Sequence, residues 1–464
     1  MGKRVHHLRQ QSLLHLDKLF GPWLPPDLLA QADEGANSRE RIFNVRRTFF
    51  GFLYQVLNPG STCRQVVQQI QALFALHQKA PVAGGTGGWC QARARLPWDI
   101  LPRLRVAIAA HTRQTAQSWF GLAVKVIDGT TVGLPDTQKN QRSYPQSATQ
   151  QPGCGFPLLK LVGVFCLATG VLLDYAKGNK HQHDLNLFQQ LRAQFKKGDL
   201  VLGDRGFSSY TLLALFLQQC VQCLFRLHQA RPGDLRQGKR LGKHDRLMTW
   251  RKPLQRPAYL SKAIWKSIPD ELTVRVLRFT LPIPGFRAKS MTLVTTLLDP
   301  KAYSAEELAK LYARRWCIEL WFRDIKTSMG MEVLRCKSPK MVHKELEMFF
   351  IAYNLIRALM VEAGALHDVP VERLSFKGTV DAVREFSIAI AQATSRKRQK
   401  HLIATLLRRI AADTVPDRPG RREPRAVKRR PKPFPLLNRH RSQFKEIPHR
   451  GRRSKKSSNS RATI

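Results

Sequence analysis

The order of strands and helices expected between residues 121 and 228 is the feature that most restricts the fold. The segment contains five apolar runs rich in β-branched residues. One helical pattern, HDLNLFQQLRAQF, lies between the third and fourth runs, and a second, SSYTLLALFLQQC, lies between the fourth and fifth. These runs predict strands at LAVKVID (122–128), FPLLKLVGVFCLAT (156–169), GVLLDYAKG (170–178), DLVLGD (199–204) and CLFRL (223–227). The resulting order is β-β-β-α-β-α-β.

This order is typical of the RNase H-like fold, an α/β fold in which three meandering strands are followed by alternating helices and strands. In that fold the first and fourth strands lie side by side. The first strand is expected to end at Asp128 and the fourth at Asp204. The two carboxylates should therefore meet at one edge of the sheet.

A third acid lies in a helical run, LYARRWCIELWFRDIK, at residues 311–326. Ser304, with Glu307 three residues later in SAEE, is expected to cap this helix as a capping box. Because each helical residue turns by about 100°, four of its side chains share a stripe about 60° wide. They are Tyr312, Arg315, Glu319 and Lys326. The neighbouring stripe is apolar and can dock on a sheet; it consists of Leu311, Ile318, Phe322, Ile325 and Met329. Taken alone, the charged stripe is equally consistent with ordinary ion pairs on a solvent-exposed helix.

The three acids together favour metal-dependent chemistry. Two divalent ions about 3.5 to 4 Å apart need several oxygen ligands, which Asp128, Asp204 and Glu319 can supply with Asp128 as the bridge. One ion would activate a water or a 3′-hydroxyl for attack on phosphorus, and the other would stabilise the leaving oxygen. No protein nucleophile is then required.

The charge of the chain points to a polyanionic partner. The 464 residues contain 78 Lys and Arg against 33 Asp and Glu, a formal net charge of +45. Such an excess favours nucleic acid as this partner. A ribosomal protein of this length with so much apolar sequence would be unusual, and the amphipathic helices of a membrane-surface protein are not evident. The start, MGKRVHHLRQ, has no apolar segment, so we expect a cytosolic location.

The flanking segments differ in character from the strand-rich middle. The first is helical, with the turn NPGS between two helices and Ser61 or Thr62 as the cap of the second. The last 50 positions, 415–464, hold 17 Lys or Arg against three acids. We expect a helical DNA-binding domain over 1–110, the first part of the RNase H-like core over 120–228, a β-rich insertion over 229–303, the catalytic helix of the core over 304–340, further helices over 341–412 and a basic, disordered tail over 413–464. Within the insertion, LTVRVLRFTL (272–281) and SMTLVTTLL (290–298) are expected to pair as antiparallel strands across the turn PIPGFRAK.

The charged stripe has the spacing Y-x2-R-x3-E-x6-K. It resembles the YREK signature of bacterial insertion-sequence transposases of the IS-four type, a family that includes the Tn-five transposase. IDGTT (127–131), GDRGF (203–207) and WCQARARLP (89–97) also resemble segments of that family, and the insertion lies where the family has one. The resemblance extends over about residues 40–440.

The resemblance implies DDE transposase chemistry with two Mg²⁺ ions, or Mn²⁺ in their place. Asp128, Asp204 and Glu319 would be the catalytic metal ligands. Tyr312, Arg315 and Lys326 would contact transposon-end DNA near the cleaved phosphate. The partners would be double-stranded end and target DNA and a second copy of the chain in a synaptic complex, in the bacterial cytoplasm at the nucleoid. If a DNA hairpin forms, the candidates for stacking on a flipped base are Trp250, Trp265 and Trp316.

Two other functions are compatible with these residues. A domesticated transposase could bind DNA without cutting it, although the presence of all three acids argues against this. A stand-alone RNase H-like nuclease would cut DNA without joining strands. Strand-transfer products separate the last possibility from transposition.

Overall fold

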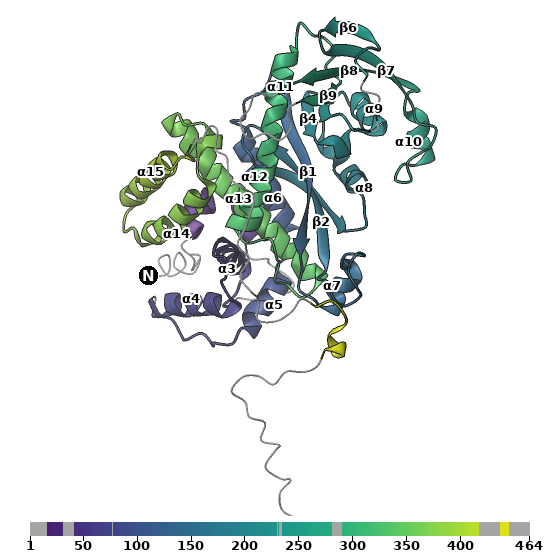
Figure 1. Cartoon of the computed structure of the whole chain (residues 1–464). Coiled ribbons are helices and arrows are strands. Elements are labelled where there is room, and N and C mark those ends of the chain that lie inside the picture. The colour runs from purple at the N-terminus through teal and green to yellow at the C-terminus, as the bar shows by residue number, and fades with distance from the viewer. Residues whose placement is uncertain are drawn as a thin grey trace, which may run out of the picture.

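A nine-stranded mixed sheet runs through the part of the chain that this computed structural model describes, residues 16–30, 41–76, 78–229, 231, 234–280, 290–416 and 437–444 (Figure 1). The strands are β1 (Ala123–Gly133), β2 (Leu158–Cys166), β3 (Leu172–Asn179), β4 (Asp199–Gly203), β5 (Gln222–Arg226), β6 (Lys239–Gly242), β7 (Asp245–Arg251), β8 (Glu271–Phe279) and β9 (Met291–Thr295). Their order across the sheet is β3-β2-β1-β4-β5-β9-β8-β7-β6. The predicted α/β class is confirmed.

Strand β1 pairs with two neighbours over different lengths. It runs parallel to β4 from Ala123 to Val126 and antiparallel to β2 from Lys125 to Gly133. The predicted side-by-side placement of the first and fourth strands is therefore correct. The predicted end of the first strand at Asp128 is wrong, because GTTVG continues the antiparallel ladder with β2 up to Gly133.

The two faces of the sheet are covered by different helices. Ile127 and Val164 belong to a core with α8 (Asp184–Phe188) and α9 (Tyr210–Gln218). Val126 and Phe165 belong to the larger core on the other face. Because side chains alternate along a strand, Asp128 points to the same face as Val126.

The insertion extends this sheet. β9 pairs antiparallel with β5, and β8, β7 and β6 follow outward from it. The expected antiparallel pair within 272–298 is confirmed as β8 and β9; the turn PIPGFRAK between them lies outside the described residues. The hairpin of β6 and β7 was not expected, because its basic sequence has little apolar alternation. A short helix, α10 (Lys262–Ser267), precedes β8.

The helical run that carries Glu319 is continuous but not uniform. It consists of α11 (Ala305–Ala313), a 3₁₀ turn (η6, Arg314–Trp316), α12 (Cys317–Arg323) and a π-helical turn (η7, Asp324–Ser328). The predicted cap is present, since Ser304 Oγ accepts from Glu307 N at 3.2 Å. The predicted apolar stripe is fully buried. Helical structure ends at Ser328, short of the expected 340.

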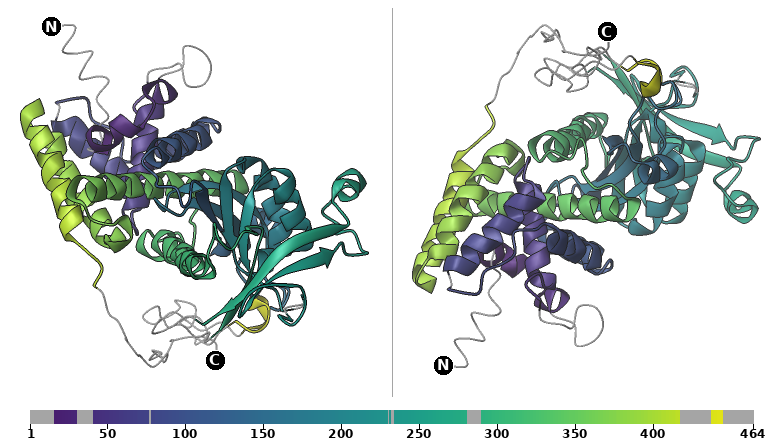
Figure 2. Two further views of the ribbon diagram at one scale, coloured as in Figure 1. Left: turned by 90° about the horizontal axis from the view of Figure 1, so that it is seen from above. Right: turned by 90° about the horizontal axis from the view of Figure 1, so that it is seen from below.

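Helices from both ends of the chain pack together on one side of the molecule, and β6 to β9 lie on the other (Figure 2). They include α2 (Leu16–Phe20), α3 (Val45–Leu57), α4 (Cys63–Leu76), α5 (Gly87–Arg95), α6 (Ile100–Arg113), α13 (Pro339–His367), α14 (Phe376–Gln392) and α15 (Arg396–Ala412). A smaller helix, α7 (Gln138–Ser143), follows β1. α13 contacts α3, α6, α14 and α15, and all of them contribute to the core that also holds Val126.

The two expected N-terminal helices are present as α3 and α4. Thr62, and not Ser61, caps α4: Thr62 Oγ1 accepts from Gln65 N and Gln65 Oε1 accepts from Thr62 N, a reciprocal capping box. α3 is buried along most of its length. Its DNA-binding role, like the domain ranges, stays a prediction. Residues 1–15, 417–436 and 445–464, with most of the expected tail, lie outside the described residues.

Among the described helices, α13 alone is long and apolar enough to cross a membrane, with a mean hydropathy of 1.4 over 18 residues. However, 78% of that stretch is buried inside the protein. Its apolar side chains contact the sheet and the surrounding helices. Its composition is therefore that of a central core helix.

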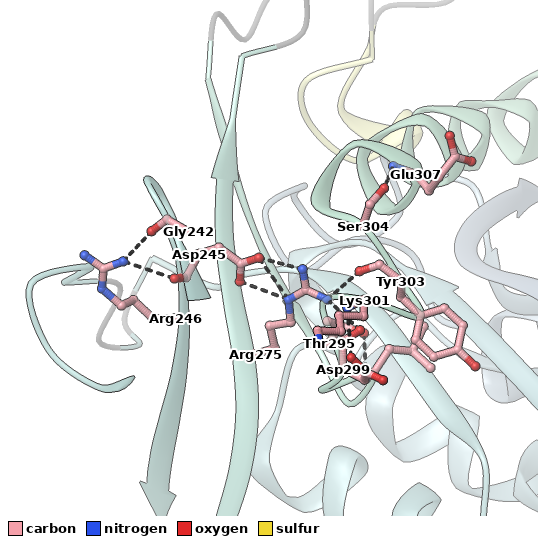
Figure 3. Close-up of polar contacts among 11 residues, drawn as sticks. Gly242, Asp245, Arg246, Arg275, Thr295, Asp299, Lys301, Tyr303, Ser304 and Glu307 are labelled. Atoms are coloured by element: carbon pink, nitrogen blue, oxygen red, sulfur yellow. Dashed lines mark hydrogen bonds and ion pairs between the residues drawn. The ribbon is translucent and has the colours of Figure 1, made fainter. Parts of the chain in front are cut away.

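A buried ion pair joins the insertion to the segment that leads into α11 (Figure 3). Arg275 on β8 contacts Asp245 on β7 through Nη2 and Oδ2 at 2.5 Å and through Nε and Oδ1 at 2.9 Å. Arg275 Nη1 also donates to the carbonyl oxygen of Tyr303 at 2.6 Å. The side chains of Arg275 and Asp245 are 1% and 9% exposed. The pair thus holds the outer strands and the start of the catalytic helix in one arrangement.

Replacing Arg275 with Met should lower the free energy of unfolding by about 3–5 kcal/mol, because Asp245 would remain buried without a counter-ion. Urea denaturation measures this. The same change at Arg251, whose partner Glu271 is mostly exposed, should cost less than about 1 kcal/mol. Equal losses in the two variants would contradict a structural role for the buried pair.

Candidate active site

Asp128 and Asp204 lie beside each other where β1 and β4 part. The last parallel pair of residues is Val126 with Leu202, and each aspartate follows two residues later. Asp204 is held at the end of β4 because its Oδ1 accepts from Gly206 N at 2.8 Å and caps the 3₁₀ turn Arg205–Phe207 (η5). Asp128 Oδ1 accepts from Gly129 N at 2.8 Å. The two carboxylates thus come from adjacent strands at one level of the sheet.

Arg315 joins Asp128 to Glu319. Its Nη1 lies 3.4 Å from Asp128 Oδ2, and its Nη2 lies 3.1 Å from Glu319 Oε1. The Arg315 side chain is 13% exposed, so this contact is shielded from solvent. Arg315 and Glu319 are therefore not an ordinary ion pair on a solvent-exposed helix, because the same guanidinium also contacts Asp128 on β1.

The electrostatic environment of Asp128 includes the charges of both other acids. Burial raises the pKa of Asp128 to about 6, while the Gly129 N–H and Arg315 act in the opposite direction. The charges of Asp204 and Glu319 add to the increase. A cation bound close to Asp128 would favour its ionised form.

Tyr312 forms part of the wall of this site. Its ring is buried, and its hydroxyl donates to the carbonyl oxygen of Gly203 at 3.2 Å. Burial raises the pKa of Tyr312 to about 12. The Arg315 guanidinium lies 5.9 Å from the centre of the ring. A direct DNA contact by Tyr312 would require the side chain to leave this position.

Lys326 is not part of this contact network. It lies in the π-helical turn η7 and is half-buried, and its ammonium group makes no hydrogen bond or ion pair in the described part of the chain. The helical wheel assumed about 100° per residue throughout, whereas the wider π turn and the tighter 3₁₀ turn change the direction of the residues that follow. The structure thus groups Tyr312, Arg315 and Glu319 and places Lys326 further along.

Arg226 is a site residue that the sequence reasoning missed. β5 pairs parallel with β4, and Gly203 lies opposite Phe225, so Arg226, the last residue of β5, lies at the level of Asp204, which directly follows β4. Its charge acts to lower the pKa of Tyr312, which places it near that side chain. The signal was present in CLFRL, a strand expected next to the one that ends at Asp204.

The three candidate stacking tryptophans have different environments. Trp250 is buried, and Trp265 is partly buried with Lys252 Nζ 4.8 Å from its ring centre. Trp316 is 48% exposed on the same helical run as Glu319. Of the three, Trp316 has the most accessible ring.

The donor set suits a hard divalent cation. Carboxylate oxygens are the protein ligands that Mg²⁺ and Mn²⁺ prefer. Among the described residues, no three His, Cys, Asp or Glu side chains are close enough to form a complete metal cluster. However, the Arg315 guanidinium lies between Asp128 and Glu319, so a positive group is already accommodated between these two acids. The residues therefore fit a cation that would replace this contact.

Comparison with known proteins identifies the class. Residues 119–355 match the family model described as the transposase DDE domain. The match covers 237 of 464 residues (355 − 119 + 1), more than half of the chain. The chain therefore belongs to the DDE transposases, enzymes that cleave DNA and transfer its strands.

Individual relatives agree with this class. The chain is 26% identical over 435 residues to the transposase InsG for insertion sequence element IS4 of Escherichia coli K12, covering 92% of this chain and 95% of that protein. It is 25% identical over 289 residues to the probable transposase for IS5377 of Geobacillus stearothermophilus, covering 61% and 69%. The cryo-EM structure of a piggyBac transposase synaptic complex with hairpin DNA matches with a TM-score of 0.43 and 10% identity, covering 85% and 84%. The predicted relationship to IS-four transposases is confirmed.

Gly163 controls how closely α12 approaches Asp128. It lies opposite Asp128 in the β1–β2 ladder. A Cβ at this position would be 2.8 Å from the Phe165 ring and 3.1 Å from the ring of Phe322 on α12. The absence of a side chain therefore lets the helix rest on the sheet.

Replacing Gly163 with Ala should destabilise the fold by about 1–3 kcal/mol, because the added methyl group overpacks the two rings. It should also reduce metal-dependent DNA cleavage, since α12 would move away from β1. Thermal melting and a cleavage assay measure both effects. Gly85→Ala is the control, because nothing lies within 4 Å of its Cβ position. A Gly163→Ala protein with unchanged stability and cleavage would contradict this role.

Asp324 is a buried carboxyl in η7, with a side chain 13% exposed. Burial raises its pKa to about 6 from an ordinary 3.8, although Arg323 and Arg357 act in the opposite direction. The folded chain therefore keeps this proton to a higher pH than the unfolded chain. It follows that this group lowers stability as pH rises from about 4 to about 6, and that the loss persists above pH 6.

Asp324→Asn should consequently raise the free energy of unfolding by about 1–3 kcal/mol at pH 7.5 and have little effect at pH 4. Urea denaturation at the two pH values tests this. Asp99→Asn, at an exposed position, should change little at either pH. If Asp324→Asn were less stable than the wild type at pH 7.5, the ionised carboxylate would be stabilising and the prediction wrong.

Proposed function

We propose that this chain catalyses cut-and-paste transposition of an insertion sequence, with Asp128, Asp204 and Glu319 as its catalytic metal ligands. The observation that carries the assignment is the Arg315 guanidinium, which contacts Asp128 on β1 and Glu319 on α12, while Asp204 follows the neighbouring strand β4 at the level of Asp128. The strand order β3-β2-β1-β4-β5 supports an RNase H-like core for this site. DDE family membership supports the same residues.

The three carboxylates would hold two Mg²⁺ ions, or Mn²⁺, with Asp128 shared between them. Bound there, the ions activate the attacking water or 3′-hydroxyl and stabilise the leaving oxygen. Arg315 would then give up its contacts with Asp128 and Glu319, and its planar guanidinium suits a DNA phosphate. Asp204 would keep its position because its Oδ1 accepts a hydrogen bond from Gly206 N.

The substrate is double-stranded DNA, first at the ends of the element and then at the target. Arg315 and Lys326 would contact the phosphate backbone near the cut. Tyr312 would hold the end of β4 against the helix through Gly203, and so would act on DNA indirectly. A homodimer would pair two ends in a synaptic complex. We infer a cytoplasmic, nucleoid-associated location from the DNA substrate.

Glu319→Gln should lower metal-dependent cleavage by at least about 1000-fold, because the site loses a charged ligand. Binding to end DNA should change little. The assay uses a duplex made from the DNA that flanks this reading frame, with Mg²⁺ or Mn²⁺, and scores both cleavage and strand-transfer joints.

Glu306→Gln is the matched control, because Glu306 lies in the same helical run but is exposed and paired with Lys310. It should cleave and join like the wild type. Cleavage by Glu319→Gln at the wild-type rate would refute the site assignment. Cleavage without any joints in the wild type would instead indicate a nuclease.

A further inference from the structure

The exposed residues of α15 (Arg396–Ala412) are all either basic or alanine. The helix contains no acidic residue, and its buried side chains are Leu406, Leu407, Ile410 and Ala411. These pack toward α13 and α14. The exposed side chains are Arg396, Lys397, Arg398, Lys400, His401, Ala404, Arg408, Arg409 and Ala412.

The cations form a continuous strip. With Lys397 at 0° on a helical wheel, Lys400 lies near 300° and Arg408 near 20°, so the three share one face. Lys397 and Arg408 are eleven residues apart, or about 16 Å along the axis. That length corresponds to about five base pairs of B-form DNA.

This strip has an electrostatic cost within the protein. In the described part of the chain none of its cations forms an ion pair, whereas Arg103, Arg236 and Arg251 have acidic partners. Arg396 and Lys400 are like charges at i and i+4, which destabilises a helix. Three cations in the first turn also oppose the helix dipole. A polyanionic partner would remove these repulsions.

The position of α15 relative to the acids suits DNA that extends beyond the cut. α14 packs against η7, which carries Lys326, and α15 packs against α14. Figure 1 and Figure 2 place α15 at the outer edge of the molecule, away from β6 and β7. A duplex passing from Glu319 across Lys326 toward this side would cross α14 and then reach α15. A second copy of the chain is a poor partner for the strip, because it would bring like charges together.

We propose that the exposed face of α15 binds the phosphate backbone of duplex DNA at a distance from the cleaved bond. The choice of DNA as the polyanion rests on the proposed function. The contact is to phosphates, so it is independent of base sequence and of divalent metal. Lys397, Lys400 and Arg408 each supply one phosphate contact.

The test compares two triple variants of the full chain. In one, Lys397, Lys400 and Arg408 are changed to Gln; in the other, Arg103, Arg236 and Arg251 are changed to Gln. Both lose three positive charges, but the control charges have acidic partners that already reduce their field. Gln is a good helix former, so α15 should be retained. Thermal melting checks this.

The probe is a 30-base-pair duplex of arbitrary sequence, titrated by fluorescence anisotropy between about 50 and 300 mM salt without divalent metal. The slope of log affinity against log salt should fall by about 2–3 in the α15 variant, since each lost phosphate contact contributes about 0.9. The control slope should change by less than about 1. Lys397→Arg with Lys400→Arg should keep the wild-type slope.

Equal slopes for the α15 variant and the wild type would overturn the proposal, as would equal decreases in both triple variants. Vesicles of phosphatidylcholine with phosphatidylserine test the other polyanion: if only vesicle binding is lost, the face is a membrane surface and the proposal is wrong. Because the binding assay needs no cleavage, a wild-type chain that never cuts DNA would refute the proposed function without affecting this result.

Discussion

The packing of α12 on the sheet is the contact on which the candidate site depends. The Phe165 and Phe322 rings meet edge to face at 5.2 Å between centroids, directly above Gly163. Trp321 packs on the same Phe165 at 5.4 Å. Since Gly163 lies opposite Asp128 in the ladder, the position at which the helix rests is also the position at which Glu319 approaches Asp128. Apolar burial thus supports an arrangement of acids that would otherwise repel.

That repulsion explains the role of Arg315 in the structure. Burial raises the pKa of Asp128, and the like charges of Asp204 and Glu319 add to the increase. Arg315 lies four residues before Glu319, one helical turn away, and so can neutralise Glu319 and Asp128 together. Arg315 thus supplies positive charge at the place where the proposed metal ions would bind.

Local sequence patterns predicted the helices and strands correctly where the interactions that form an element can be read from its own residues. Five core strands, the Ser304 cap and the buried stripe of the catalytic helix follow from apolar periodicity and from the hydrogen-bonding capacity of serine. The β6–β7 hairpin was missed because its stability comes from pairing with β8 and from the Arg275–Asp245 pair, neither of which is visible in a basic local sequence. The π turn that carries Lys326 was not anticipated either, because a uniform helical wheel assumes one turn angle throughout.

The sequence by itself determined which residues are candidates for the chemistry: an acid within one buried strand, an acid directly after another, a third on an amphipathic helix, and a strongly basic chain around them. It determined the adjacency of β1 and β4 as well, because the order of elements restricts the topology. Only the tertiary structure decided that Arg315 lies between Asp128 and Glu319, that Tyr312 is buried against Gly203, and that the insertion continues the central sheet from β5. These are contacts between segments far apart in the chain, and they depend on packing distances that no local pattern encodes.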